Sequence, residues 1–144
     1  MKKIFAFLLC AVTFANIAGC SDDEDESILT SPDALVGKWE CYKDYDGEFD
    51  VWDYDYGEGI DLYLYEFRAD GTGAYRLDDY MDVWIQFTYK LSGNMLSIVN
   101  EKEPDYVEYI RIDNLTSSEL VLAYDYKGDD GKQYTDKEYF KRIN

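Results

Sequence analysis

Histidine is absent from this chain of 144 residues, and basic residues, cysteine and proline are scarce. Without histidine, a Ser-His-Asp triad, a Cys-His pair and the common zinc sites are excluded. Glycine-rich phosphate-binding motifs are missing too, so we expect no cofactor. A hydrolase would have to use paired carboxylates. Because 31 acidic residues offer such pairs everywhere, they indicate no particular catalytic site, and we expect that the protein is not an enzyme.

The N-terminal segment has the three parts of a bacterial export signal. Two lysines form a positive region, residues 4–15 are almost entirely apolar, and residues 17–19 precede Cys20. The apolar part is too short for a membrane-spanning helix. A cysteine at the cleavage point predicts a lipoprotein signal peptide over residues 1–19, with Cys20 as the lipidated first residue of the mature protein. An ordinary signal followed by a chance cysteine is the alternative.

A block of acids follows the expected lipidation site. Residues 21–26 read Ser-Asp-Asp-Glu-Asp-Glu, without an apolar side chain. This composition predicts a flexible acidic linker over residues 20–34. The block also resembles the acidic signal that sends some Gram-negative lipoproteins to the outer face of the outer membrane. We therefore expect a lipid anchor in the outer membrane and favour the cell surface.

The remaining chain is strongly acidic. The whole chain has a net charge of −17, and the signal removes two lysines and no acid, so the mature chain has a net charge of −19. Such a surface repels nucleic acid and anionic headgroups, and it favours cations or a basic protein. Apart from the lipidated cysteine, the mature chain has one cysteine, Cys41. Its place in an apolar strand predicts a buried side chain.

Alternation of apolar and polar residues dominates the rest of the chain, which predicts strands and no long helix. Gly, Asn and Asp stand between these segments, where hairpin turns need them. Eight short strands with tight turns predict an all-β domain over residues 35–144, an antiparallel up-and-down β-barrel, with a β-sandwich as the alternative. The expected strands cover residues 35–44, 60–68, 72–77, 82–91, 95–100, 106–113, 119–126 and 135–143.

One connection is longer than a hairpin needs. Residues 45–59 hold five aromatic side chains among six acids, and long loops on compact domains are often functional. Asp53, Asp55 and Asp61 invite a calcium interpretation. The spacing does not match an EF-hand, however, so a solvated acidic loop is favoured and these three aspartates are weak candidates.

Four short motifs resemble bacterial lipocalin-like lipoproteins. Gly37-Lys38-Trp39 is similar to the Gly-x-Trp signature that opens lipocalins, and residues 67–73, 89–96 and 139–143 resemble later hairpins and the last strand. The resemblance implies a lipocalin-like barrel in which Arg142 packs over Trp39 at one end, as a structural pair. The chain lacks the middle signature of classical lipocalins and room for their C-terminal helix. These differences argue against transferring the small hydrophobic ligands of classical lipocalins to this chain.

Fifteen tyrosines exceed what a core of this size needs, so some of them are candidates for a binding site. The leading hypothesis is a noncatalytic barrel that binds a small apolar, aromatic or sugar-like ligand at its open end. The alternatives are a filled barrel whose acidic surface binds or inhibits a basic partner protein, and a carboxylate-based hydrolase. The expected ligand-binding residues are Trp52, Tyr54, Tyr56, Tyr63, Tyr65, Phe87, Tyr89 and Tyr124.

Overall fold

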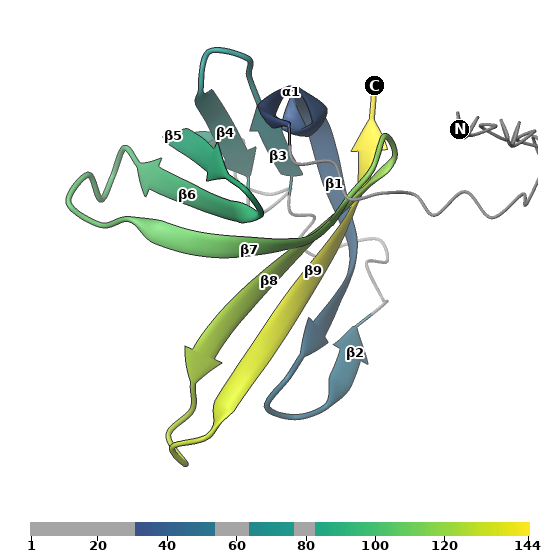
Figure 1. The fold of residues 1–144 in the computed structure, drawn as a ribbon, viewed down its shortest axis with the longest axis vertical. Coiled ribbons are helices and arrows are strands. Elements are labelled where there is room, and N and C mark those ends of the chain that lie inside the picture. The colour runs from purple at the N-terminus through teal and green to yellow at the C-terminus, as the bar shows by residue number, and fades with distance from the viewer. Residues whose placement is uncertain (1–30, 54–63, 77–82) are drawn as a thin grey trace, which may run out of the picture.

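The structure is a computed structural model that describes residues 31–53, 64–76 and 83–144. Its strands form one antiparallel sheet in the order β2-β1-β3-β4-β5-β6-β7-β8-β9, and β1 also pairs with β9. This last pairing closes eight strands into a barrel, with β2 as an added strand beside β1 (Figure 1). The eight-stranded up-and-down barrel is thus confirmed, and the β-sandwich alternative is wrong.

Most strands begin and end near the expected residues. The strand expected from residue 82 begins at Ile85, and Val83 before it is exposed. Within the described residues, no helix is long and apolar enough to cross a membrane. The elements are α1 (Pro32–Leu35), β1 (Gly37–Asp46), β2 (Val51–Asp53), β3 (Leu64–Phe67), β4 (Thr72–Arg76), β5 (Ile85–Ser92), β6 (Met95–Asn100), β7 (Glu108–Leu115), β8 (Glu119–Lys127) and β9 (Gln133–Ile143).

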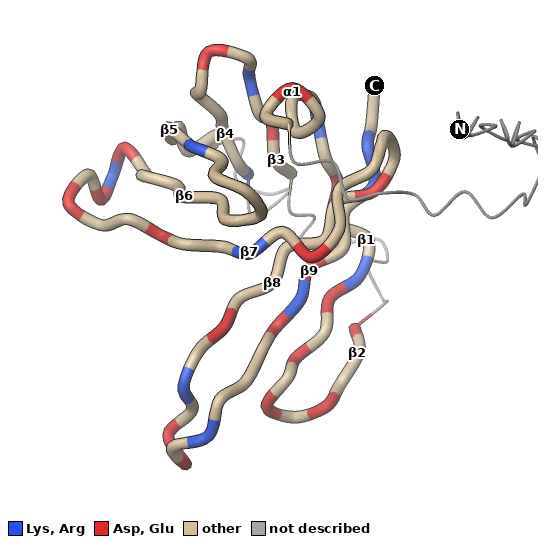
Figure 2. The backbone as a smooth tube through the Cα atoms, in the orientation of Figure 1, with Lys and Arg blue, Asp and Glu red and all other residues tan. Residues whose placement is uncertain are grey.

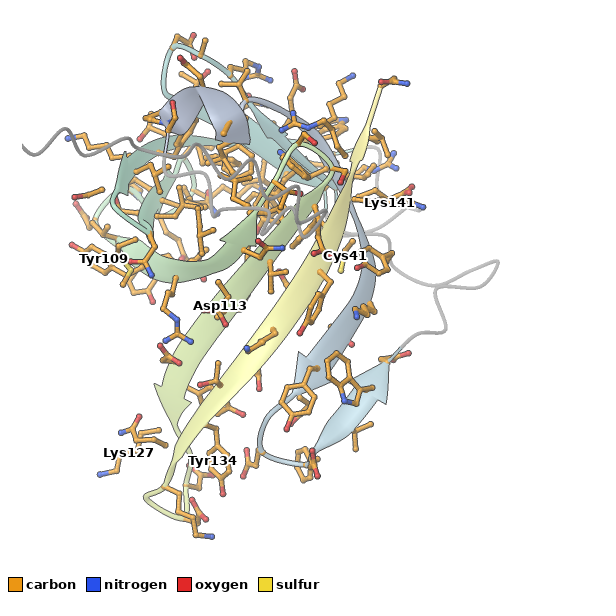
Figure 3. All side chains as sticks on the ribbon, turned by 45° about the vertical axis from the view of Figure 1, so that its right-hand side comes forward. Cys41, Tyr109, Asp113, Lys127, Tyr134 and Lys141 are labelled. Carbon is orange, nitrogen blue, oxygen red and sulfur yellow. The ribbon has the colours of Figure 1, made fainter. Side chains whose placement is uncertain are left out.

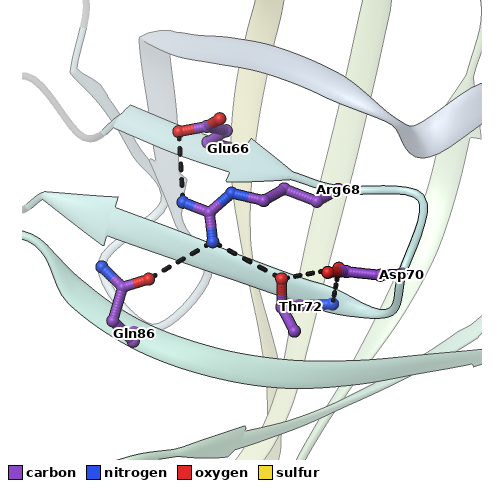
Figure 4. A network of polar contacts seen from close by, with 5 residues as sticks. All are labelled: Glu66, Arg68, Asp70, Thr72 and Gln86. Atoms are coloured by element: carbon purple, nitrogen blue, oxygen red, sulfur yellow. Dashed lines mark hydrogen bonds and ion pairs between the residues drawn. The ribbon is translucent and has the colours of Figure 1, made fainter.

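Side-chain hydrogen bonds fix the β3–β4 turn. The carboxylate of Asp70 accepts from the backbone N–H of Thr72 at 2.9 Å and from its hydroxyl at 2.6 Å. These bonds stabilise the charged carboxylate and lower its pKa. The guanidinium of Arg68 donates to Thr72 Oγ1 at 3.4 Å and to Gln86 Oε1 at 3.3 Å (Figure 4). The outer wall of β3, β4 and β5 is therefore tied together by polar side chains.

The apolar core occupies one end of the barrel, which we call the closed end. Short helix α1 lies across this end, capped by the Ser31 hydroxyl, which accepts from the N–H of Asp33 at 3.3 Å. The last residues of the expected linker, from Pro32 onward, instead belong to α1, whose Leu35 is buried. Cys41 is buried as expected. The core side chains that are at most 1% exposed include Leu35, Trp39, Cys41, Phe67, Leu96, Ile110, Leu115, Leu120, Leu122 and Phe140.

Two hairpins extend beyond the other strands at the opposite end, which we call the mouth (Figure 1). The pairing of β7 with β8 stops at Ala123, whereas β8 and β9 stay paired to Lys127. Lys127 and Tyr134 accordingly lie near the tip of the β8–β9 hairpin, well beyond Asp113 (Figure 3). The β1–β2 hairpin runs alongside, because β1 pairs with β9 as far as Tyr45. The mouth therefore has one tall side, made of β8, β9, β1 and β2.

The first part of the loop expected over residues 45–59 is instead a hairpin. Strand β1 continues through Asp46, the chain turns, and β2 pairs back onto β1. The Asp46 carboxylate accepts the N–H groups of Glu48 and Phe49, both at 2.9 Å, and Asp50 adopts a positive φ of 53°. Aspartate tolerates both roles in turns, so the acids that suggested a loop instead form a tight hairpin.

Candidate functional site

A polar clamp holds the closed end of the barrel. The indole N–H of Trp39 donates to the backbone oxygen of Leu35 at 2.8 Å, and the Arg142 guanidinium lies 4.1 Å from the Trp39 ring centroid. This guanidinium also donates to the carbonyls of Ala34, Val36 and Ser117 at 2.6, 2.6 and 2.7 Å. Trp39 and Arg142 therefore lie as the resemblance implied, and they join α1 to the first strand, the last strand and the β7–β8 turn.

Gly37 is the part of the Gly-x-Trp motif that makes room for this clamp. Its φ is 141°, a conformation that side chains rarely adopt. A Cβ atom at this position would collide with the guanidinium of Arg142. The motif therefore has a packing role at the closed end.

Aromatic rings fill the barrel above the clamp. Tyr65 packs at centroid distances of 5.6 Å on Phe67, 6.0 Å on Phe87 and 5.5 Å on Phe140. Tyr89 packs edge-on against Phe67 at 5.1 Å, and its hydroxyl donates to the carbonyl oxygen of Arg68 at 2.7 Å. Phe87 and Tyr89 are only 3% and 7% exposed. Three of the expected ligand-binding residues, Tyr65, Phe87 and Tyr89, thus belong to a packed layer.

A polar layer follows between this packing and the mouth. The Tyr124 hydroxyl donates to Glu138 Oε2 at 2.7 Å, and Asn100 donates to the Tyr75 hydroxyl at 2.8 Å. Burial raises the pKa of the Glu138 carboxyl to about 7, and the nearby carboxylates of Asp44, Glu108 and Asp136 contribute. Burial also raises the pKa of the Tyr65 and Tyr124 hydroxyls well above the ordinary value. Charge is therefore disfavoured at this level of the barrel.

A cleft of about 640 Å³ opens above the polar layer, between the two extended hairpins; we call it the mouth cleft. Strand registers bring its walls together, since Asp44 pairs with both Asp53 and Glu138, and Tyr124 pairs with Asp136. Acidic residues recur along both hairpins (Figure 2). The cleft is lined by Asp44, Tyr45, Asp46, Phe49, Val51, Asp53, Tyr124, Asp136, Lys137 and Glu138.

Carboxylates outnumber cations in the mouth cleft. Among the described residues of its walls are five acids and one cation, Lys137. The Lys137 ammonium is itself engaged by Asp113, with Nζ 2.7 Å from Oδ2. Asp113 also accepts from Arg111, and these two partners lower its pKa against the effect of burial. The cleft therefore combines apolar and aromatic surface with a negative electrostatic potential.

Trp52 lies on the other face of the β1–β2 hairpin. Its neighbours Val51 and Asp53 line the cleft, so the alternation of the strand points Trp52 outward. The indole packs on Tyr45 at 4.8 Å and on Tyr139 at 5.6 Å, with the Lys43 ammonium 5.1 Å from its centroid. Trp52 is therefore not among the residues that line the cleft, and its part in ligand binding stays a prediction. Among the described residues expected at the site, Tyr124 does line the cleft.

Most of the remaining expected site residues lie outside the described part of the chain. Asp53 lies in the cleft wall, whereas Asp55 and Asp61 lie outside the described residues, as do Tyr54, Tyr56, Tyr63 and Cys20. Among the residues that the structure describes, no group of three or more acids or cysteines is placed to hold a metal ion.

The most important cleft residues were not expected from the sequence. In β9, counting in twos from buried Phe140 leads inward to Glu138 and Asp136, so the alternation held a usable signal. In β1, the same count from Cys41 would place Lys43 inside. A β-bulge between Cys41 and Lys43 shifts the register by one residue and turns Asp44 inward instead. The sequence carries no clear sign of this bulge.

Comparisons with known proteins agree with the lipocalin-like fold of the barrel. Residues 35–122 match the family model of the lipocalin-like domain. A lipocalin-like protein from Bacteroides uniformis, known from a crystal structure, has a similar fold, with a TM-score of 0.54 and 16% sequence identity. The likeness covers 76% of this chain and 99% of that protein, and at this identity it shows the fold alone. No curated protein matches the chain.

Proposed function

The chain belongs to the family of lipocalin-like domains, and from this premise we propose that it is a lipid-anchored, noncatalytic binding protein. Its ligand is a small molecule with an apolar or aromatic body, held in the mouth cleft. A sugar-like ligand fits the same combination of ring surface and polar groups. The proposal departs from a deep lipocalin cup, because the closed half of this barrel is filled by side chains.

The mouth cleft is the observation that carries the proposal. Its volume of about 640 Å³ lies within the range of ~300–1,000 Å³ that is typical of small-molecule sites. Phe49 and Val51 offer apolar surface at its rim and are 72% and 54% exposed. Exposed apolar side chains beside a cleft support a binding role.

A cleft-filling substitution tests this proposal. We expect that Val51→Trp removes binding of any small molecule found by a thermal-shift screen of the full chain in nonionic detergent. Met95→Trp is the matched control, because Met95 is also exposed, at 40%, but begins β6 at the closed end. If Val51→Trp binds as the wild type does, the ligand is not held in the mouth cleft.

The anchor at Cys20 is the second part of the proposal, and the position of α1 supports it. The described chain begins beside α1, at the closed end, so a lipid on Cys20 would leave the mouth free (Figure 1). We expect Cys20→Ala to abolish incorporation of labelled fatty acid and to shift the protein out of the membrane fraction. Protease digestion of intact cells tests surface exposure, since a domain on the inner leaflet of the outer membrane would be protected.

A basic protein is a second candidate partner, favoured by the acidic mouth and the exposed ring of Phe49 at its edge. Hen lysozyme serves as a cationic probe. Capture that is strong at low salt and lost at high salt would support this candidate, because exposed charges are screened within about 10 Å at 0.1 M salt. Capture that Val51→Trp leaves unchanged would place the partner outside the cleft.

A further inference from the structure

Resting on the proposed function, we propose that the ligand of the mouth cleft carries an amine, and that its positive charge pairs with the carboxylate of Glu138 at the base of the cleft. Glu138 is then the residue that determines specificity for a cation. The other cleft acids set the surrounding potential. Two features of Glu138 support this assignment: its position at the base of the cleft, and the lack of a described basic side chain paired with its carboxylate.

Glu138 lies where the packed barrel meets the open cleft. It is partly buried, it stands two residues from buried Phe140 on the inner face of β9, and it lines the cleft. Its Oε2 atom is held by the Tyr124 hydroxyl at 2.7 Å. Tyr124 thus fixes one oxygen of the carboxylate and positions the group without neutralising it.

No cation of the described chain pairs with this carboxylate. The hydrogen bond from Tyr124 is the one that Glu138 accepts among the described residues. The neighbouring lysine, Lys137, also lines the cleft, but its ammonium pairs with Asp113, with Nζ 2.7 Å from Oδ2. An internal carboxylate without a counter-ion is costly, and it is stabilised when an opposite charge arrives. A ligand amine would supply that charge.

The surroundings of Glu138 make this demand for a cation stronger. Among the described residues, the charged groups that shift the pKa of Glu138 are all carboxylates, and they repel its negative charge. The titratable groups around it are Asp44 of β1, Tyr65 of β3, Glu108 of β7, Tyr124 of β8 and Asp136 of β9.

Binding of an amine should therefore be coupled to a proton. The pKa of Glu138 is about 7, so near neutral pH a large fraction of the carboxyl is protonated in the free protein. An ammonium group favours the charged carboxylate and expels this proton. We expect release of a fraction of a proton per amine near neutral pH, and weaker binding as the pH falls below 6.

Matched probes test the charge separately from the body of the ligand. We would titrate the full chain, in nonionic detergent at pH 8, with tryptamine and tryptophol, phenethylamine and 2-phenylethanol, and 1,8-diaminooctane and 1,8-octanediol. We expect at least one amine to bind about tenfold more tightly than its alcohol, because charge-assisted hydrogen bonds are the stronger ones. Glu138→Gln should reduce this preference to about one, with the Tyr124 hydrogen bond kept. Glu103→Gln, at an exposed site in the β6–β7 connection, should retain it.

The outcomes separate this inference from the proposed function. Equal binding of amines and alcohols, lost in Val51→Trp, would overturn the inference and leave the cleft as a binding site. A preference for amines that survives in Glu138→Gln would overturn the assignment to Glu138. Binding of neither member of any pair at millimolar concentration would contradict both. Calorimetry in buffers of different ionisation enthalpy measures the proton release, and its absence in the wild type would also count against Glu138.

Discussion

The closed end and the mouth of this barrel are built from the same strands, yet their inner faces have opposite chemistry. Strand β9 places Phe140 inside at the closed end and Glu138 inside at the mouth. Strand β8 likewise changes from Leu122 to Tyr124. The change takes place within one inward step of each strand. The packed core and the cleft therefore lie at different ends of one continuous sheet.

The two ends also differ in how their polar groups are satisfied. At the closed end, the Arg142 guanidinium has a carbonyl or a ring on every side. At the mouth, Glu138 has one tyrosine and several like charges around it. A fully paired charge stabilises a fold, whereas a carboxylate without a counter-ion is stabilised when a cation binds to it.

The largest effect on stability should come from removing a large core side chain at the closed end. We expect Trp39→Ala to lower the free energy of unfolding by about 3–5 kcal/mol, because it leaves a cavity and removes the ring beneath Arg142. Urea unfolding followed by circular dichroism measures the loss. Phe49→Ala, at an exposed site, should change it by less than about 0.5 kcal/mol. Similar losses in the two variants would contradict the division between the ends.

A smaller loss of stability should follow when the guanidinium of the clamp is replaced by an ammonium, which has the same charge but another geometry. We expect Arg142→Lys to lower the free energy of unfolding by roughly 2 kcal/mol, because an ammonium cannot reach three carbonyls and stack on Trp39. Lys141→Met is the control, since it breaks only an exposed ion pair with Glu40, worth less than about 1 kcal/mol. If Arg142→Lys left the free energy of unfolding unchanged, packing of the rings alone would be enough to stabilise this end.

At the mouth, neutralising a carboxylate should stabilise the fold. Glu138 has an ordinary pKa of 4.5 and a pKa of about 7 in the folded chain, so its favourable contribution is present below pH 4.5 and lost as the pH rises through 7. We expect Glu138→Gln to raise the free energy of unfolding by on the order of 2 kcal/mol at pH 8 and to have little effect at pH 4. Destabilisation at pH 8 would show that the charged carboxylate is already compensated.

The smallest effect should come from the hydroxyl that positions Glu138. The Tyr124 hydrogen bond lowers the pKa of this carboxyl, so Tyr124→Phe should raise it above its wild-type value of about 7. The free energy of unfolding should change by less than about 1.5 kcal/mol. An NMR titration of the Glu138 carboxyl carbon measures the pKa. Tyr75→Phe, whose hydroxyl partners Asn100, should leave it unchanged, and a shift there would mean that the polar layer titrates as one unit.

The sequence predicted the closed end well because that end follows simple alternation. Trp39 and Phe140 belong to regular strands, and the Gly-x-Trp motif implied the packing of Arg142 on Trp39. Short turns with Gly and Asp set the order of the strands, so the barrel itself was predictable.

The mouth was harder to predict for two physical reasons. The bulge after Cys41 reverses the inward face of β1, and nothing in the local sequence requires it. The acids of the β1–β2 hairpin looked like a loop, although Asp46 caps a tight turn with its carboxylate. The many aromatic residues also led to Trp52 as an expected ligand-binding residue, although it packs on Tyr139, and not to Glu138, which lines the cleft.

The most direct test of this division maps the position of a bound amine. We would titrate tryptamine into the isotope-labelled full chain and follow the backbone amide shifts by NMR. We expect the shifts to concentrate at Asp44, Val51, Tyr124 and Glu138, and the amides around Trp39, Leu120 and Phe140 to stay in place. Shifts centred on Trp39, Leu120 and Phe140, without shifts of the amides at the mouth, would contradict the account.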